Sequence, residues 1–84
     1  MSEAQITRKF IDILRGYVKD PALLEKATKE TNILRDLKVN SARLVDIIIQ
    51  SEDAFDIGID DDDADQIKTI GDAVRVVERK LVAA

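Results

Sequence analysis

The main evidence for the fold lies in residues 41–55, which read SARLVDIIIQSEDAF. Five of these residues, beginning at Leu44, lie at positions i, i+3, i+4, i+7 and i+11, and four of the five are large and apolar. This spacing predicts an α-helix with one buried face. Ser51 is polar where this pattern calls for a large apolar residue, and we expect its hydroxyl to donate to a carbonyl one turn earlier. The predicted buried face consists of Leu44, Ile47, Ile48, Ser51 and Phe55.

A second apolar row follows the same segment on a neighbouring face and consists of Ala42, Val45 and Ile49. The acidic residues Asp46 and Glu52 lie beside it. An apolar row with charged neighbours indicates a docking surface for another protein. The alternative is that the helix is buried over a wide arc, and the pattern alone leaves both interpretations open.

The chain before this segment predicts one long helix and then a loop. The long helix is expected over residues 3–17 or 3–18, because apolar residues again recur at helical spacing. Asp20 followed by Pro21 indicates the N-cap and first position of a short helical turn. Residues 28–40 are mixed and polar, and we interpret them as a loop. The apolar residues of the long helix are Ile6, Phe10, Ile13, Leu14 and Tyr17.

The chain after residue 55 predicts two more helices. The acids of residues 60–63 suit a helix start, where the helix dipole is positive, and a short helix with Ala64 and Ile67 is expected there. Thr69 and Asp72 form a short-armed capping box that opens the last helix. The predicted fold is therefore all-α, a small four-helix bundle with three main helices and a short third one. The inward residues of the last helix are Ile70, Ala73, Val74, Val77 and Leu81.

Length and composition exclude several classes of protein. The 84 residues make a single domain, 1–84, with one modest core. The chain has no His and no Cys, so it lacks the usual neutral-pH base and the most reactive nucleophile. We therefore expect a protein that enzymes act on, with no catalytic residues of its own. No apolar run is long enough for a membrane span, and the first residues lack signal-peptide features, so a cytoplasmic location is expected.

Charge is distributed unevenly along the sequence. Residues 41–65 contain nine acids and one base, Arg43, in a chain of net charge −4. Such a surface repels nucleic acid and anionic lipid and attracts basic protein surfaces. The alternative is that these acids only solvate the surface. The run at residues 60–63 lacks the ligand spacing, central glycine and terminal glutamate of an EF-hand loop, so we expect no metal site.

Ser41 stands at the start of the predicted central helix, where serine is most often an N-cap. Its only basic neighbour is Arg43, which stays protonated and cannot activate the hydroxyl. A self-activated nucleophile is therefore not expected, whereas a serine modified by another enzyme remains open.

The spacing around Ser41 resembles a known family. The segment LKVNSARLVD of residues 37–46, continued without gaps to Ile57, is similar to the second-helix region of acyl carrier proteins. Residues 55–59, the acids after them and residues 64–74 resemble the third and fourth helices of the same family. The resemblance covers roughly residues 31–81.

The resemblance implies a function. In this family the serine that opens the second helix receives 4′-phosphopantetheine, which places the covalent cofactor on Ser41. The arm's thiol would hold acyl intermediates as thioesters in fatty acid biosynthesis or a related specialised lipid or polyketide pathway. The implied partners are a phosphopantetheinyl transferase, with magnesium in its own site, and acyl-transfer and condensing enzymes with basic docking surfaces. A monomer is expected, and the bundle is expected to shelter the acyl chain between the second and third helices of the family fold, where Ser51 would make the space less apolar if it lines it.

Several residues depart from the family pattern. Asn40 replaces the usual Asp, Ala42 the usual Leu, Arg43 a common acid and Lys38 a frequent Gly. These changes reduce apolar area and invert a charge at the docking edge, which suggests a specialised carrier. The residues that the resemblance assigns to partner docking are Asn40, Ala42, Arg43, Val45, Asp46, Ile49 and Glu52.

Two alternative functions stay open. The first is a carrier for a non-fatty cargo, such as an aminoacyl or short specialised acyl unit. The second is a helical protein-interaction domain that never receives the arm, in which Ser41 is only a cap.

Overall fold

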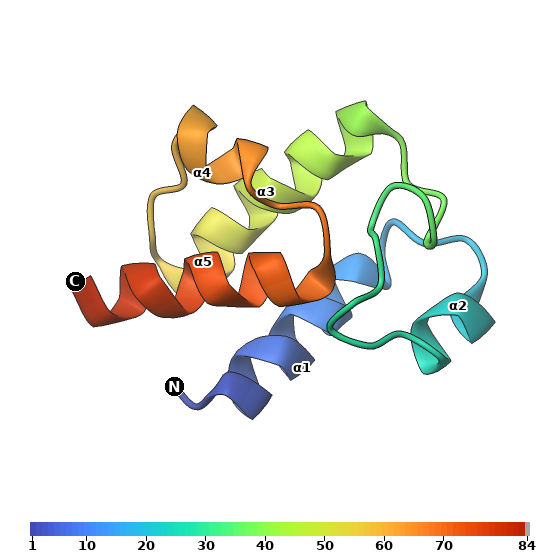
Figure 1. The fold of residues 1–84 in the computed structure, drawn as a ribbon, viewed down its shortest axis with the longest axis horizontal. Helices are drawn as coiled ribbons and strands as arrows, with labels where there is room; N and C mark the ends of the chain where they lie inside the picture. Colours follow the sequence, from blue (N-terminus) through green and yellow to red (C-terminus); the bar gives the residue numbers. More distant parts are fainter. Residues whose placement is uncertain (84) are drawn as a thin grey trace.

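The computed structural model describes residues 1–83, and this part of the chain forms five helices (Figure 1). The helices are α1 (Glu3–Leu14), α2 (Pro21–Glu25), α3 (Ser41–Phe55), α4 (Asp61–Asp65) and α5 (Ile70–Ala83). Across residues 1–83 the only sheet-like pairing is an isolated bridge between Asn32 and Thr69. The all-α prediction is therefore confirmed: α1, α3 and α5 are the main helices, α4 is the short one, and α2 is the helical turn expected after Pro21.

Helix α1 begins where the sequence predicts but ends earlier. Ser2 and Gln5 form a capping box, in which each side chain accepts a hydrogen bond from the other's backbone amide. The helix ends at Leu14, so the predicted end at residue 17 or 18 is wrong. The amides of Gly16 and Tyr17 bond to carbonyls three residues earlier, at 3.2 and 2.9 Å, which tightens the chain into a 3₁₀-like turn.

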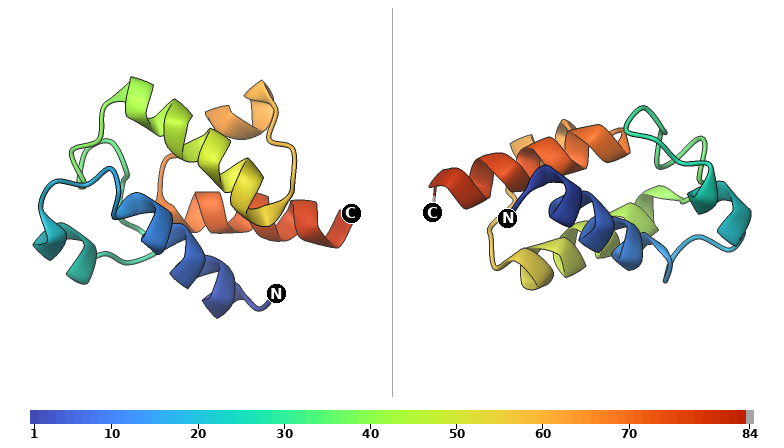
Figure 2. Two further views of the ribbon diagram at one scale, coloured as in Figure 1. Left: turned by 180° about the vertical axis from the view of Figure 1, so that it is seen from behind. Right: turned by 90° about the horizontal axis from the view of Figure 1, so that it is seen from below.

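Helix α1 packs against both of the other long helices, α3 and α5 (Figure 2). The Tyr17 hydroxyl donates to Gln50 Oε1 of α3 at 2.9 Å. The Lys9 ammonium lies 5.2 Å from the centroid of the Phe55 ring, within cation–π range. Lys9 in α1 and Tyr17 in the turn after it thus both contact the C-terminal half of α3.

The core lies between the three long helices and includes buried residues from the loop before α3. Phe55 is 5% exposed and closes the C-terminal end of the predicted α3 stripe. Ser51 is 1% exposed, and its hydroxyl donates to the Ile47 carbonyl at 2.8 Å, as expected. The loop residues in the core are Ile33, Leu37 and Val39.

The loop between α2 and α3 crosses the start of α5, and we call this contact the loop–α5 seam. It consists of backbone hydrogen bonds between segments far apart in the sequence, a pattern that periodicity cannot reveal. The bonds run from Ile33 N to Lys68 O at 2.9 Å, from Ile70 N to Thr31 O at 3.0 Å and from Gly71 N to Lys29 O at 2.8 Å.

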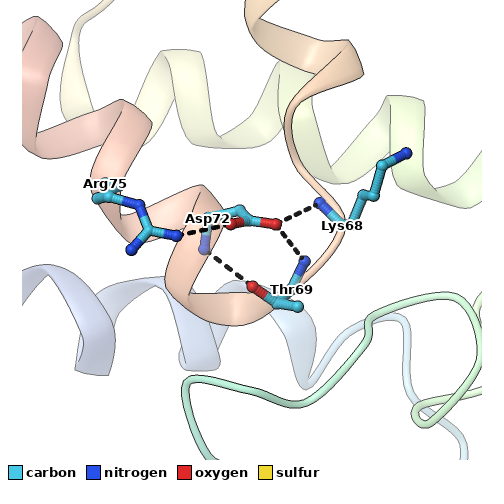
Figure 3. A network of polar contacts seen from close by, with 4 residues as sticks. All are labelled: Lys68, Thr69, Asp72 and Arg75. Atoms are coloured by element: carbon cyan, nitrogen blue, oxygen red, sulfur yellow. Dashed lines mark hydrogen bonds and ion pairs between the residues drawn. The ribbon is translucent and has the colours of Figure 1, made fainter.

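The first turn of α5 has the capping box that the sequence predicts (Figure 3). The Asp72 amide donates to Thr69 Oγ1, while Asp72 Oδ2 accepts from the amides of Thr69 and Lys68. Arg75 donates to Asp72 Oδ1 at 2.7 Å. Partial burial raises the pKa of Asp72, but these hydrogen bonds outweigh it, and the pKa lies below the ordinary aspartate value.

Asp63 joins helix α4 to α5 through ion pairs, which the sequence alone did not predict. Asp60 caps α4 by accepting from the Asp63 amide at 2.9 Å. The Asp63 side chain is 10% exposed; its Oδ2 lies 2.7 Å from Lys80 Nζ, and its Oδ1 accepts from Arg79. The hydrogen bond from Lys80, together with both positive charges, holds the pKa of Asp63 below its ordinary value. Ile67 is buried as expected but follows α4 instead of belonging to it.

Candidate functional site

Ser41 is the first residue of α3 and is exposed to solvent. The N-cap is Asn40, whose Oδ1 accepts a hydrogen bond from the Arg43 amide at 2.8 Å. Ser41 is therefore not the cap, and the interpretation of this serine as a capping residue is wrong. Within residues 1–83 the Ser41 hydroxyl makes no hydrogen bond, so it is accessible to an incoming enzyme.

The loop before Ser41 positions the start of α3. Val39 is 4% exposed and anchors the loop in the core, two residues before the serine. Lys38 has a φ of 58°, in the left-handed region, so the chain turns sharply there. The position with this backbone conformation is the one where the resembling family frequently has glycine. A turn anchored by Val39 thus presents Ser41 at the start of α3.

The second apolar row of α3 lies on the surface. Val45 and Ile49 are each 55% exposed, and Ala42 is also exposed. Burial of α3 over a wide arc would have covered these side chains, so the structure contradicts that alternative. The row starts one residue after Ser41 and continues along the same helix.

The acidic neighbours of this row differ from each other. Asp46 is exposed and makes no ion pair with the residues that the structure describes. Glu52 is half-buried, and its Oε2 accepts from the Ile59 amide at 2.9 Å. Glu52 thus ties the end of α3 to the segment before α4, a role that its position in the acidic run did not indicate.

A small cavity lies in the core beside α3. Its volume is about 10 Å³, and Leu44, Ile48 and Ser51 of α3 contribute to its wall. Ile59 and Ile67, on either side of α4, contribute another part. Ser51 therefore lines this space, but the volume is no larger than one water molecule requires. The cavity as it stands is too small for an acyl chain.

Two further observations concern membranes and metals. No helix in residues 1–83 is both long and apolar enough to cross a bilayer. In the same residues, no three Asp or Glu side chains gather as metal ligands would.

Comparisons with known proteins match nearly the whole chain. A family model described as the phosphopantetheine attachment site matches residues 12–77, a range that includes Ser41. The acyl carrier protein of Lactobacillus acidophilus is 38% identical over 78 residues, which cover 93% of this chain and 95% of that protein. The acyl carrier protein of Desulforapulum autotrophicum is 40% identical with the same coverage.

A solved structure is similar as well. It is that of the acyl carrier protein from Enterococcus faecalis, with a TM-score of 0.76 and 26% identity. The match covers 95% of this chain and 99% of that one. The chain therefore belongs to the acyl carrier protein family, whose domain carries the attachment site for 4′-phosphopantetheine.

Proposed function

We propose that the 4′-phosphopantetheine of this acyl carrier protein is attached to the Ser41 hydroxyl. The observation that carries the proposal is the exposure of Ser41 at the first position of α3, with Asn40 serving as the cap in its place. A residue whose hydroxyl is free and exposed fits covalent attachment of a long arm. The rest of the molecule then serves to present that serine.

The attachment step needs a partner enzyme. The transferase would join Ser41 Oγ to the phosphorus that carries the pantetheine in coenzyme A. The pyrophosphate P–O bond of coenzyme A breaks, and adenosine 3′,5′-bisphosphate leaves. The hydroxyl proton passes to a base in the transferase, because the neighbours of Ser41 in the chain, Asn40 and Ala42, carry no basic side chain and the guanidinium of Arg43 remains protonated. When bound, the arm supplies a thiol that holds an acyl group as a thioester.

Partner enzymes are proposed to bind α3 along its exposed row. The exposed row Ala42, Val45 and Ile49 supplies apolar contact, and Asp46 lies within it as a charge for basic surfaces. Glu52, bonded to Ile59, has less freedom to contribute. We propose further that the domain acts as a monomer in the cytoplasm, that residues 1–84 are one carrier unit, and that all chemistry belongs to the partner enzymes.

The test of attachment is mass measurement after incubation with coenzyme A and a broad-specificity phosphopantetheinyl transferase. The parent protein should gain one arm, and Ser41→Ala should gain none. Ser2→Ala is the matched control, because Ser2 is also an exposed serine beside a helix start, and this variant should gain one arm. An arm on Ser41→Ala would refute the assignment. A parent protein isolated without the arm and resistant to several transferases would favour the interaction-domain alternative.

The cargo is proposed to be a specialised acyl group handled by dedicated enzymes. Asn40, Ala42 and Arg43 surround the serine and depart from the pattern of the family. The double change Ala42→Leu with Arg43→Asp should leave the melting temperature near that of the parent, because both positions are exposed. It should raise turnover by condensing enzymes of general fatty acid synthesis. Unchanged turnover would remove the main support for specialisation, and the mass of any thioester trapped in the native cell would distinguish fatty from aminoacyl cargo.

A further inference from the structure

A hollow of about 350 Å³ lies beside the first turn of α3. It is lined by residues 16–19 from the turn after α1, by residues 38–40 and by Arg43, and we call it the basic hollow. The two loop segments come from distant parts of the sequence and meet at the end of the molecule that carries α2 (Figures 1 and 2).

Three cations line the basic hollow, Lys19, Lys38 and Arg43, and no acidic residue lines it. All three are exposed, and none forms an ion pair within residues 1–83. This arrangement is opposite to the general composition, because the chain has a net charge of −4. Positive charge concentrated in a concave surface attracts an anion.

Lys38 adds a second observation. Its backbone φ of 58° is one that glycine adopts freely and that a long side chain adopts at a cost. The position therefore carries a cation where the backbone itself favours glycine. Such a conflict between local preference and residue type is typical of a functional side chain.

The position of Ser41 identifies the anion. Asn40 and Arg43, which line the basic hollow, lie one and two residues from Ser41 in the chain, so the phosphate of an arm on Ser41, one ester bond beyond the hydroxyl, would be within reach of the hollow. Arginine and lysine are the side chains that bind phosphate most strongly. Covalent attachment also gives the phosphate a high effective concentration, so each contact can be weak. An acidic surface of a partner would lack this fixed position.

We propose that the basic hollow is a phosphate site that holds the phosphodiester of the arm on Ser41. The arm then rests against the turn after α1, and partner enzymes draw it away. This inference depends on the proposed attachment at Ser41, and it assigns Lys19, Lys38 and Arg43 as positioning residues for the arm.

Amide NMR signals provide the test, recorded for the ¹⁵N-labelled protein with and without the arm. The signals of residues 16–19 should shift on modification although they are remote from Ser41 in the sequence. These shifts should be lost in Lys19→Gln and at about 1 M salt, where the Debye length falls to about 3 Å. Lys26→Gln is the matched control, because Lys26 is an exposed lysine that does not line the hollow, and it should retain the shifts.

Several results would overturn the inference. Residues 16–19 unmoved in a protein shown by mass to carry the arm would refute the phosphate site while leaving the attachment intact. Equal shifts in Lys19→Gln and Lys26→Gln would have the same meaning. Shifts that arise only when a partner enzyme is added would assign the hollow to protein docking.

Failure of the attachment itself is tested separately. If mass measurement shows that Ser41 carries no arm, the unmodified protein is titrated with coenzyme A, which has phosphates of its own. Shifts at residues 16–19 that Lys19→Gln abolishes would support the phosphate site without attachment, and their absence would overturn it. If the protein does carry the arm, shifts with free coenzyme A on Ser41→Ala but not on modification would assign the site to loading and refute the resting arm.

Discussion

At the scale of single residues, two side chains occupy backbone that favours glycine. Among the residues described, only Lys38 and Asp56 combine a side chain with a positive φ, at 58° and 55°. Asp56 follows α3 as its C-cap, and short polar side chains tolerate this conformation comparatively well. The long side chain of Lys38 does not stabilise this conformation in the same way, so the backbone is strained three residues before Ser41.

We expect Lys38→Gly to raise the free energy of unfolding by roughly 0.5–1 kcal/mol, because relief of the left-handed strain exceeds the added chain entropy. Urea denaturation measures the change. Lys38→Ala is the control, since it removes the charge but keeps the strain, and it should not stabilise the protein. If the two variants gain equally, charge and not backbone strain explains the effect.

Ser51 shows how a single polar residue fits the core. Its hydroxyl donates to the Ile47 carbonyl, so burial leaves no donor unsatisfied. The cavity beside it holds only about 10 Å³. The small serine side chain therefore leaves this narrow space between α3 and α4 unfilled, and its hydroxyl makes the wall slightly polar.

At the scale of elements, α4 depends on its neighbours. It spans five residues, too few for a helix to be stable alone. Asp60 caps its start, and Asp63 joins it to two cations of α5. The position of α4 over the core is thus set by one carboxylate more than by the helix itself.

Acid should release this attachment. Because the folded-state pKa of Asp63 lies below its ordinary value, its contribution to stability is present above the unfolded pKa of about 4 and is lost as pH falls through the folded value. We expect the melting temperature of the parent to decrease once the pH is lowered below about 4. Asp63→Asn should start lower at neutral pH and lose less over the same range.

The matched control for this experiment is Asp61→Asn, an exposed aspartate of the same helix with no ion pair to the residues described. It should follow the parent at every pH. Asp36 and Asp72 also have lowered pKa values, so part of the acid sensitivity should persist in Asp63→Asn. Identical pH profiles for Asp63→Asn and the parent would contradict the role of Asp63.

At the scale of the whole molecule, the loop–α5 seam closes the fold. It connects the long loop before α3 with the first turn of α5 by three backbone hydrogen bonds. Gly71 lies where the chains are closest: a Cβ added there would lie 2.9 Å from the Lys29 carbonyl oxygen. The close approach requires glycine for lack of space, since no glycine of the described chain has a positive φ.

Gly71→Ala should therefore destabilise the protein by about 1–3 kcal/mol, the usual cost of forcing backbone segments apart. Thermal and urea unfolding measure it. Gly58→Ala is the control, because a Cβ at Gly58 meets nothing within 4 Å, and its effect should stay within about 0.5 kcal/mol. A stable Gly71→Ala with the seam hydrogen bonds protected from exchange would show that the loop can yield.

Features set by neighbouring residues could be predicted from the sequence, whereas contacts between remote segments could not. Helical periodicity and the Thr69–Asp72 capping box are local, and they located all three long helices. The ion pairs of Asp63 and the meeting of Lys19 with Arg43 join remote segments, so no spacing in the sequence reveals them. The early end of α1 was missed because Tyr17 continues the apolar spacing inside a tighter turn.

The candidate site shows the same division. The resemblance to a family assigns the attachment to Ser41, which stays a prediction. The hydrophobic pattern indicated a second row on α3, and its residues Val45 and Ile49 are exposed. The identity of the cap was missed, because the expected helix start favoured Ser41 as the cap although Asn40, one residue earlier, is an equally good capping residue. The engagement of Glu52 with Ile59 depends on how the chain turns after α3, which periodicity does not describe.

The exposed row on α3 also governs how copies of the protein treat one another. Val45 and Ile49 would adhere to the same patch on a second molecule if nothing kept the two apart. At neutral pH like-charge repulsion opposes that encounter, since every copy carries the same net charge of −4 and has Asp46 beside the row. Near the isoelectric point this repulsion vanishes while the apolar surface remains. The surface that we propose for partner docking thus makes the resistance of the protein to self-association depend on its charge.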